Sequence, residues 1–224
     1  RTRKAKAVRR ALGAVKPPGL YFSPGTLWVI DLQGPFLEPD MDVTMPKSKR
    51  WALTCYDPVT CFLTYDILDS PNSDAVTRSC HRIFSVHGVP RAVVVDAGTA
   101  LCGQQFLGFL RSNAVAHATM PRSSKHYAGF YERCHGLLLD QVRARLLQAE
   151  QDDEAVTFEA LYGDSVAAVN KLPLHEFGGI SAYELYFSRK PRYLVGTNPD
   201  DDMAIGAHRL QHWLPCLQED DRKG

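Results

Sequence analysis

The sequence lacks any apolar run approaching the ~18 residues that a membrane-spanning helix needs, which argues against a membrane protein. Its six cysteines include no C-x-x-C pair, and the basic N-terminus lacks the apolar core of a secretory signal. We therefore expect free, mostly buried thiols, a reducing compartment and no secretion, with a disulfide framework as the alternative. Internal repeats and low-complexity tracts are also absent, which argues against a solenoid or a propeller.

The composition is that of a globular protein with an uneven distribution of charge. The 224 residues, 45% of them apolar and 23% charged, suit one large domain or one domain with appendages. Residues 1–16 hold seven basic side chains and no acidic one; without them, 19 basic residues face 25 acidic ones. A basic arm on a mildly acidic body suggests a polyanion at the arm and cations held by the body.

The hydrophobic pattern predicts an α/β domain. Alternating or continuous apolar runs predict strands at 26–31, 51–56, 61–67, 92–96 and 115–119. Helical spacing predicts helices at 73–87, near 106–110, and at 130–148, 158–171 and 181–187. This order favours a mixed sheet covered by helices. We expect Gly34-Pro35 to close the first strand, and residues 120–129 show no clear periodicity.

Three carboxylates differ from ordinary surface acids in their surroundings. Asp31 and Asp96 each end an apolar strand-like run, at the edge of the expected core. A carboxylate buried there is unfavourable unless it is paired or holds a metal, although each could instead cap a turn or a helix. Glu132 lies in the first turn of the predicted long helix, where the helix dipole favours an acid. There are 64 residues between the aspartates and 35 between Asp96 and Glu132.

At this spacing the chain resembles the catalytic core of retroviral and retrotransposon integrases, whose signature is two aspartates followed by a glutamate. The segments that carry the resemblance are Trp28-Val-Ile-Asp-Leu-Gln-Gly-Pro35, His87-Gly-Val-Pro90, Val95-Asp-Ala-Gly-Thr99, Gly129-Phe-Tyr-Glu-Arg133, Asn170, Gly179-Ile-Ser-Ala-Tyr-Glu184 and Arg189-Lys-Pro-Arg192. The resemblance implies a ribonuclease-H-like fold, with a mixed five-stranded sheet flanked by helices. It divides the chain into a basic N-terminal arm or linker (1–19), an integrase catalytic core (20–195) and an acidic C-terminal tail (196–224).

The same resemblance implies that Asp31, Asp96 and Glu132 are catalytic and hold two Mg²⁺ or Mn²⁺ ions, with Asp31 bridging both. Oxygen-only ligands suit these hard ions. The implied reactions are hydrolysis at the 3′ end of element DNA, followed by attack of the freed 3′-hydroxyl on a phosphodiester of the target duplex. The implied partners are the element ends, the target duplex and further copies of the chain, in the host nucleus and without a membrane.

Basic residues near the expected site suggest where DNA would approach. Arg122, Lys125 and His126, together with Arg133, would place positive charge beside the carboxylates. A solvated basic loop would show the same pattern. The arm at residues 1–16 would either hold DNA without sequence preference or link the core to an upstream module.

Several positions depart from the integrase pattern. Ala97 stands where Asn is usual, so Asp96 has less support from its loop, whereas Ala182, where Pro is usual, is a minor departure. Gly136 and Leu139 stand where viral members often have lysines. No His/His/Cys/Cys zinc module precedes the core and little chain follows it, so we expect a core fragment, an excerpt or a decayed copy. Two alternatives to an active integrase follow: a catalytically silent, integrase-derived domain that binds DNA or chromatin, and a nuclease of the same fold.

Overall fold

The computed structural model describes residues 22–37, 49–96, 98–120 and 125–191, with the backbone alone for residues 125–132. The chain divides into two units, residues 1–189 and 190–224, and every helix and strand described below lies in the first. The predicted arm at 1–19 and the predicted tail at 196–224 lie outside the described residues.

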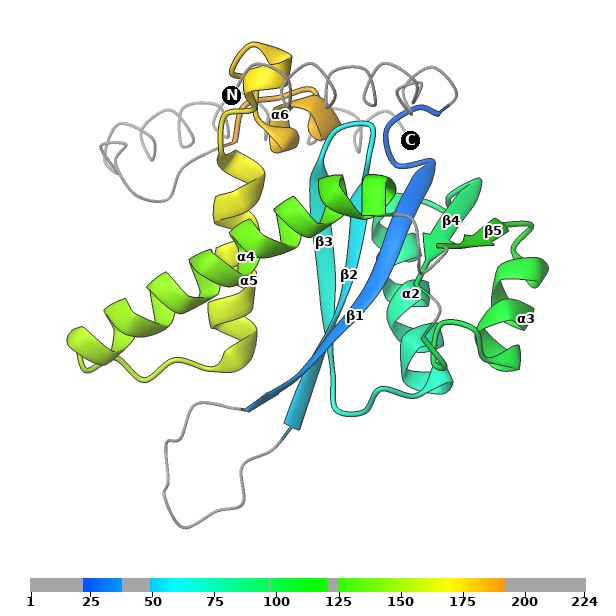
Figure 1. The fold of residues 1–224 in the computed structure, drawn as a ribbon, viewed down its shortest axis with the longest axis horizontal. Helices are drawn as coiled ribbons and strands as arrows, with labels where there is room; N and C mark the ends of the chain where they lie inside the picture. Colours follow the sequence, from blue (N-terminus) through cyan, green and yellow to red (C-terminus); the bar gives the residue numbers. More distant parts are fainter. Residues whose placement is uncertain (1–21, 38–48, 97, 121–124, 192–224) are drawn as a thin grey trace, which may run out of the picture. The chain divides into compact units, whose positions relative to one another are not determined.

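Five strands form one mixed sheet. They are β1 (Leu27–Leu37), β2 (Lys49–Asp57), β3 (Phe62–Leu68), β4 (Ala92–Val95) and β5 (Ala116–Thr119). Their order across the sheet is β3-β2-β1-β4-β5. β1 pairs antiparallel with β2 and β2 with β3, whereas β1 pairs parallel with β4 and β4 with β5. The mixed five-stranded sheet expected from the sequence is therefore confirmed (Figure 1).

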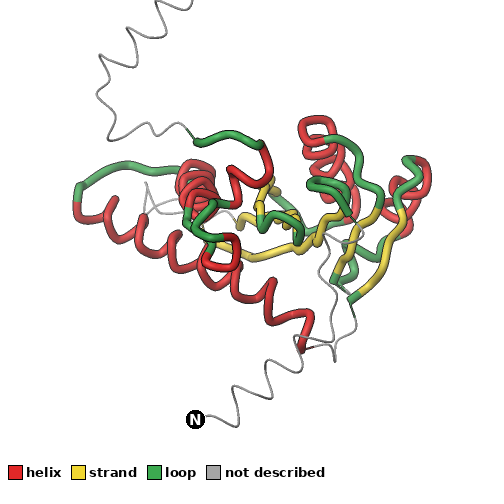
Figure 2. The backbone as a smooth tube through the Cα atoms, turned by 90° about the horizontal axis from the view of Figure 1, so that it is seen from above, coloured by secondary structure: helices red, strands yellow, loops and turns green. Residues whose placement is uncertain are grey.

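Helices lie on both sides of the strands (Figure 2). They are α2 (Ser73–His87), α3 (Gln104–Ser112), α4 (Lys125–Gln151), α5 (Phe158–Lys171) and α6 (Ala182–Phe187), with a 3-10 turn, η2 (His175–Phe177), before α6. Cys55 of β2 faces Cys80 of α2, whereas its neighbour Thr54 faces His135 of α4. Because strand side chains alternate between faces, α2 and α4 cover opposite faces of the sheet.

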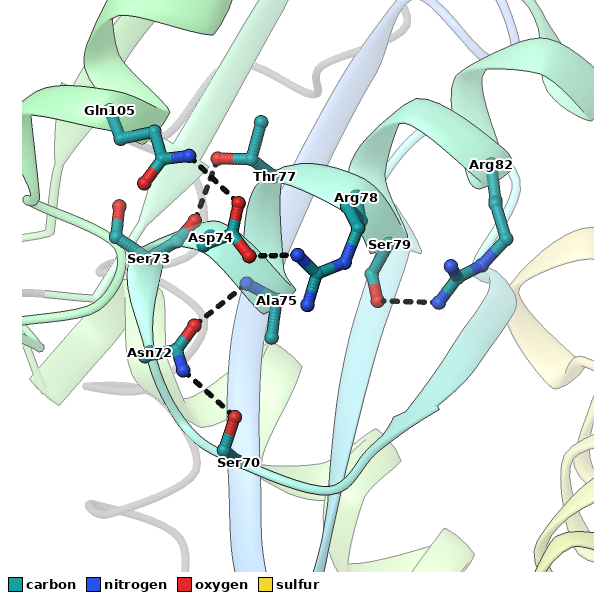
Figure 3. A network of polar contacts seen from close by, with 10 residues as sticks. All are labelled: Ser70, Asn72, Ser73, Asp74, Ala75, Thr77, Arg78, Ser79, Arg82 and Gln105. Carbon is teal, nitrogen blue, oxygen red and sulfur yellow. Dashed lines mark hydrogen bonds and ion pairs between the residues drawn. The ribbon is translucent and has the colours of Figure 1, made fainter.

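Helix α2 begins at a polar network that also anchors α3 (Figure 3). The Asn72 side chain caps the helix by accepting a 2.8 Å hydrogen bond from the Ala75 N–H. Asp74 accepts a hydrogen bond from Gln105 of α3 at 2.8 Å. Behind this polar end, Val76, Cys80, Ile83 and Phe84 recur at helical spacing and are buried. The helix therefore packs by its apolar stripe and is oriented by its first turn.

The first strand continues through Gly34-Pro35, which we had expected to end it. The register with β2 shifts between Gln33 and Phe36, so β1 carries a β-bulge there. Proline, which has no N–H to donate, is tolerated at such a bulge. Gly34 has a φ of 129°, and a Cβ on it would lie 2.9 Å from the Arg50 carbonyl oxygen. Glycine is therefore required for the strand to pass this point.

The long helix α4 spans Lys125–Gln151, so the predicted range of 130–148 was too short at both ends. An apolar repeat in the sequence indicates which residues of a helix are buried, and it does not indicate where the helix begins or ends. The five residues from Lys125 to Gly129 contain little apolar surface, so they carry no such repeat.

The core contains large apolar side chains from the sheet and from helices of both faces, including Trp28, Leu53, Phe106 and Leu138. The five described cysteines are free, and Cys55, Cys61 and Cys80 among them are buried. Among the described residues, the helices are too short or too polar to cross a membrane.

Candidate active site

The two predicted catalytic aspartates lie side by side at the junction of β1 and β4. Ile30 pairs with Val95 in the parallel register of these strands, and Asp31 and Asp96 are the next residues of each chain segment. Ile30 and Val95 are fully buried. Because side chains alternate along a strand, Asp31 points to the opposite face, the one that α4 covers, and Asp96 lies close enough for its charge to act on Asp31. β4 ends at Val95, so the predicted strand at 92–96 was one residue too long and Asp96 follows the observed strand.

The electrostatics of Asp31 reflect both its burial and its neighbour. Burial raises the pKa of Asp31 to about 6, and the negative charge of Asp96 adds to this rise, although a hydrogen bond from the Leu32 N–H lowers it. Two adjacent carboxylates repel each other, and a cation between them relieves that repulsion. Carboxylate oxygens are ligands that Mg²⁺ and Mn²⁺ prefer. The donor chemistry at this edge therefore fits a hard divalent cation.

Helix α4 carries the third predicted catalytic residue, Glu132, of which the backbone is described. Glu132 lies one helical turn before His135, and residues three apart lie on the same side of a helix. His135 contacts Asp31, so α4 crosses the sheet with this turn against β1 (Figure 1). Among the described side chains, which exclude that of Glu132, no three His, Cys, Asp or Glu residues gather into a metal site. The role of Glu132 stays a prediction.

His135 is a site residue that the sequence reasoning missed. Its Nδ1 lies 3.4 Å from Oδ2 of Asp31, and its Nε2 lies 3.2 Å from Oγ1 of Thr54. The residue is only 9% exposed. Burial lowers the pKa of His135 to about 4, so the ring is neutral at pH 7 and its 3.4 Å contact with Asp31 does not join two opposite charges. The available signal was its position three residues after Glu132.

A second contact connects the same face of β1 to α5. The Tyr162 hydroxyl donates a 2.9 Å hydrogen bond to Oε1 of Gln33, which is two residues beyond Asp31 and so faces the same way. Tyr162 is fully buried. Its burial and the charge of Asp31 raise its pKa, so the hydroxyl stays protonated and acts as a donor. α4 and α5 thus both attach to β1 through polar side chains near Asp31.

The predicted DNA-contacting residues lie in or just before α4. Arg133 is exposed on this helix. Lys125 and His126 form part of its first turn, for which the backbone is described, whereas Arg122 lies outside the described residues. The structure brings Arg133 to the site end of α4 beside Glu132, and the DNA contacts themselves stay predictions.

Two of the departures from the integrase pattern have a structural setting. Ala182 is the first residue of α6, directly after the capping residue Ser181, whose side chain and Glu184 form a capping box. Proline is favoured at that first helical position, and alanine also suits it, so the substitution is mild. Gly136 is exposed on α4. Ala97 lies outside the described residues.

Comparisons with solved structures identify the fold. The chain superimposes on a chain of the simian T-cell lymphotropic virus intasome, solved with PP2A regulatory subunit B56 gamma, with a TM-score of 0.61 and 15% identity over 79% of this chain and 59% of that one. The magnesium complex of the HTLV-2 integrase catalytic core, in its trimeric form, matches with a TM-score of 0.58 and 17% identity, over 74% and 98% of the two chains. The BIV integrase catalytic core matches with a TM-score of 0.56 and 16% identity, over 73% and 95%.

The fold is therefore that of a retroviral integrase catalytic core, and at this level the resemblance noted in the sequence is confirmed. No protein-family model matches the sequence. Among curated proteins, an uncharacterized protein of Caenorhabditis elegans is 20% identical over 184 residues, which are 81% of this chain. The chain spans 14% of the length of that relative.

Proposed function

We propose that this chain is the catalytic core of a retroelement integrase, which processes the 3′ ends of element DNA and joins them to a target duplex. The observation that carries the proposal is the proximity of Asp31 and Asp96, which directly follow the register partners Ile30 and Val95, with Asp31 on the face that α4 covers. α4 brings Glu132 to the same side through the contact between His135 and Asp31. The likeness of the fold to integrase cores supports the same assignment.

In this proposal Asp31, Asp96 and Glu132 hold two Mg²⁺ or Mn²⁺ ions. Ions bound there would stabilise the charge that develops on the attacking and leaving oxygens of a phosphoryl transfer. Asp31 is suited to bridge, because it is the more buried of the two aspartates and sits between Asp96 and α4. The HTLV-2 catalytic core was solved in complex with magnesium, which supports this choice of ion.

DNA, further copies of the chain and the host nucleus complete the proposal. Arg133 presents positive charge at the site end of α4, and we assign Arg122, Lys125 and His126 to the same phosphate-binding surface. The HTLV-2 core was solved in trimeric and dimeric forms, which supports a homo-oligomer. Substrate DNA in a retroelement cycle would be met in the nucleus.

The test is strand nicking of a labelled duplex in the presence of Mn²⁺. D31N, D96N and E132Q should each abolish nicking while thermal unfolding stays cooperative. D140N is the matched control, because Asp140 is an exposed acid on α4 paired with Arg143 and should leave nicking unchanged. Wild-type nicking rates in any of the three site variants would contradict the assignment. Joining of the labelled strand to a second duplex separates an integrase from a nuclease of this fold.

A catalytically silent domain that binds DNA or chromatin is the second candidate. It is favoured by Ala97, which brings no amide to the loop beside Asp96, where integrases commonly have Asn. Calorimetric titration separates the candidates. Retained DNA binding without Mg²⁺ or Mn²⁺ binding would favour the silent domain, and metal binding with nicking would favour the enzyme.

A further inference from the structure

The ring of His135 joins three elements of the fold at the proposed metal site. From α4 it reaches Asp31 of β1 through Nδ1, at 3.4 Å from Oδ2, and Thr54 of β2 through Nε2, at 3.2 Å from Oγ1. Thr54 is the register partner of Asp31 in the antiparallel pair, and its hydroxyl also lies 3.4 Å from the Asp31 carbonyl oxygen. The histidine, the threonine and the aspartate therefore form one connected polar group.

This group lies where α4 otherwise packs by apolar contacts. Leu138, the next residue on the same side of the helix, is fully buried, and His135 is 9% exposed. A polar side chain in such a place is costly unless its donors and acceptors are paired. Both ring nitrogens have a partner here. An ionised carboxylate can only accept, so the tautomer that pairs both nitrogens carries its proton on Nδ1, and the Thr54 hydroxyl then donates to Nε2 rather than to the Asp31 carbonyl.

The orientation of a carboxylate decides which of its lone pairs face a bound cation. The contact of Nδ1 with Oδ2 of Asp31, at 3.4 Å, restricts rotation of the carboxylate and keeps Oδ1 for other ligands. Partners of this kind, which touch a ligand rather than the metal, commonly change metal affinity by about 10- to 100-fold when they are removed. The contact between His135 and Asp31 also fixes the position of α4, and with it the helical turn that holds Glu132.

We propose that His135 is a positioning residue of the metal site: its ring ties α4 to Asp31 and Thr54 and thereby holds the Asp31 carboxylate in its cation-binding orientation. The inference rests on the proposed function, because it assigns to Asp31 the role of a metal ligand. It adds a residue and a contact to the three carboxylates.

Two replacements of His135 distinguish the polar contact between Nδ1 and Asp31 from simple packing of the ring. In H135N, the amide nitrogen occupies the position of Nδ1 and still donates toward Asp31. In H135Q, the amide group occupies the position of Nε2 and serves Thr54 instead. L138A is the control for packing of α4, because Leu138 is fully buried one turn after His135 and its apolar side chain donates no hydrogen bond.

The experiment is calorimetric titration of the full chain with MnCl₂, together with thermal unfolding in the absence of metal. H135Q should weaken Mn²⁺ binding by about 10-fold or more, whereas H135N should retain most of the wild-type affinity. L138A should lower the melting temperature while leaving the Mn²⁺ affinity close to that of the wild type.

Three results would overturn the inference. They are unchanged Mn²⁺ affinity in H135Q, equal losses in H135N and H135Q, and a loss in L138A as large as that in H135Q. Failure of the proposed function is recognised separately, because it appears in the wild-type chain: a wild type that binds no Mn²⁺ removes the metal site and the positioning role with it.

Discussion

The side-chain amide of Asn170 in α5 forms two hydrogen bonds with the backbone of a single residue, Leu63 in β3. Oδ1 accepts from the Leu63 N–H and Nδ2 donates to the Leu63 carbonyl, each at 2.8 Å. β3 stands at the edge of the sheet and pairs with β2 on one side. Asn170 therefore acts at this point as a neighbouring strand would, and it attaches α5 to the sheet.

Replacing Asn170 by alanine should lower the free energy of unfolding by about 2–3 kcal/mol, because a buried N–H and a buried carbonyl of Leu63 lose their partners. Urea denaturation measures the change. N113A is the control, since Asn113 is exposed and its side chain bonds the Phe109 carbonyl at the end of α3. We expect N113A to cost less than about 1 kcal/mol. An equal loss of the free energy of unfolding in N170A and N113A would show that the hydrogen bonds to Leu63 stabilise the fold no more than an exposed hydrogen bond does.

Asp31 should make the metal-free protein less stable as the pH rises from about 4 to 6. Its pKa is about 6 in the folded chain, above the ordinary 3.8, so over this window the folded state keeps a proton that the unfolded state has lost. Raising the pH therefore disfavours folding. D31N should gain stability relative to the wild type across this window and hold a constant advantage above pH 6.

The melting temperature of D31N minus that of the wild type, measured between pH 4 and 7, checks this prediction. The difference is the right quantity because His135 contributes the opposite slope in both proteins: its pKa of about 4 lies below the ordinary 6.5, so its protonation on acidification disfavours folding. A difference that does not change with pH would contradict the raised pKa of Asp31. Mn²⁺ should raise the wild-type melting temperature more at pH 7 than at pH 5, because protons compete for the carboxylate.

The sheet and most helices were predictable because their signals are local. The apolar run before Asp31 and the run before Asp96 each mark a strand. The parallel pairing of β1 with β4 places the two carboxylates close together, because each directly follows one member of the pair Ile30 and Val95. The spacing of these residues and Glu132 pointed to the integrase core. The bulge at Gly34 was not predictable, because glycine and proline together are also the commonest signal for a turn.

The contact of His135 with Asp31 and Thr54 could not be predicted from the sequence, for a different reason. Thr54 and His135 are 81 residues apart, and their meeting depends on the angle at which α4 crosses the sheet. The angle at which a helix crosses a sheet produces no periodic pattern in the sequence. Asn170 was part of the family resemblance, but its role as a substitute strand depends on β3 being an edge strand, which only the strand order reveals.

Acidification should also destabilise the protein through His87. Its ring lies among Trp28, Phe62 and Tyr186, with centroid separations of 5.8, 5.8 and 5.6 Å, and burial lowers its pKa. A histidine with a lowered pKa stabilises the fold while it is neutral, above about pH 6.5, and this contribution is lost as the pH falls below that value.

H87F keeps an aromatic ring in the cluster and removes the charge. The melting temperature of H87F minus that of the wild type should increase between pH 7 and pH 5, because only the wild type gains a buried charge in the cluster. H81F is the comparison, because it makes the same replacement at an exposed histidine of the same helix. A profile for H87F that follows the wild type would show that the cluster tolerates the charged ring.

Two helical glycines should respond in opposite directions to replacement by alanine. Around Gly136 of α4 nothing lies within 4 Å of an added Cβ, so G136A should raise the free energy of unfolding by about 1 kcal/mol through helix propensity alone. At Gly163 of α5, the added Cβ would press against the Tyr65 hydroxyl, whose ring packs on Tyr162 at 5.2 Å. G163A should therefore lower the free energy of unfolding by about 1 kcal/mol or more, although alanine has the same advantage in helix propensity there.

Urea denaturation of the two variants under identical conditions measures both effects, and the sign of each is the informative result. Stabilisation by G163A would mean that Tyr65 moves aside easily, so that α5 is less closely fitted to β3 than its contacts indicate. Destabilisation by G136A would mean that a second copy or a part of the chain outside the described residues covers this side of α4, because no described atom meets the new methyl group. Repeating the G136A measurement over a range of protein concentrations separates a second copy of the chain from an effect within one copy, since only association depends on concentration.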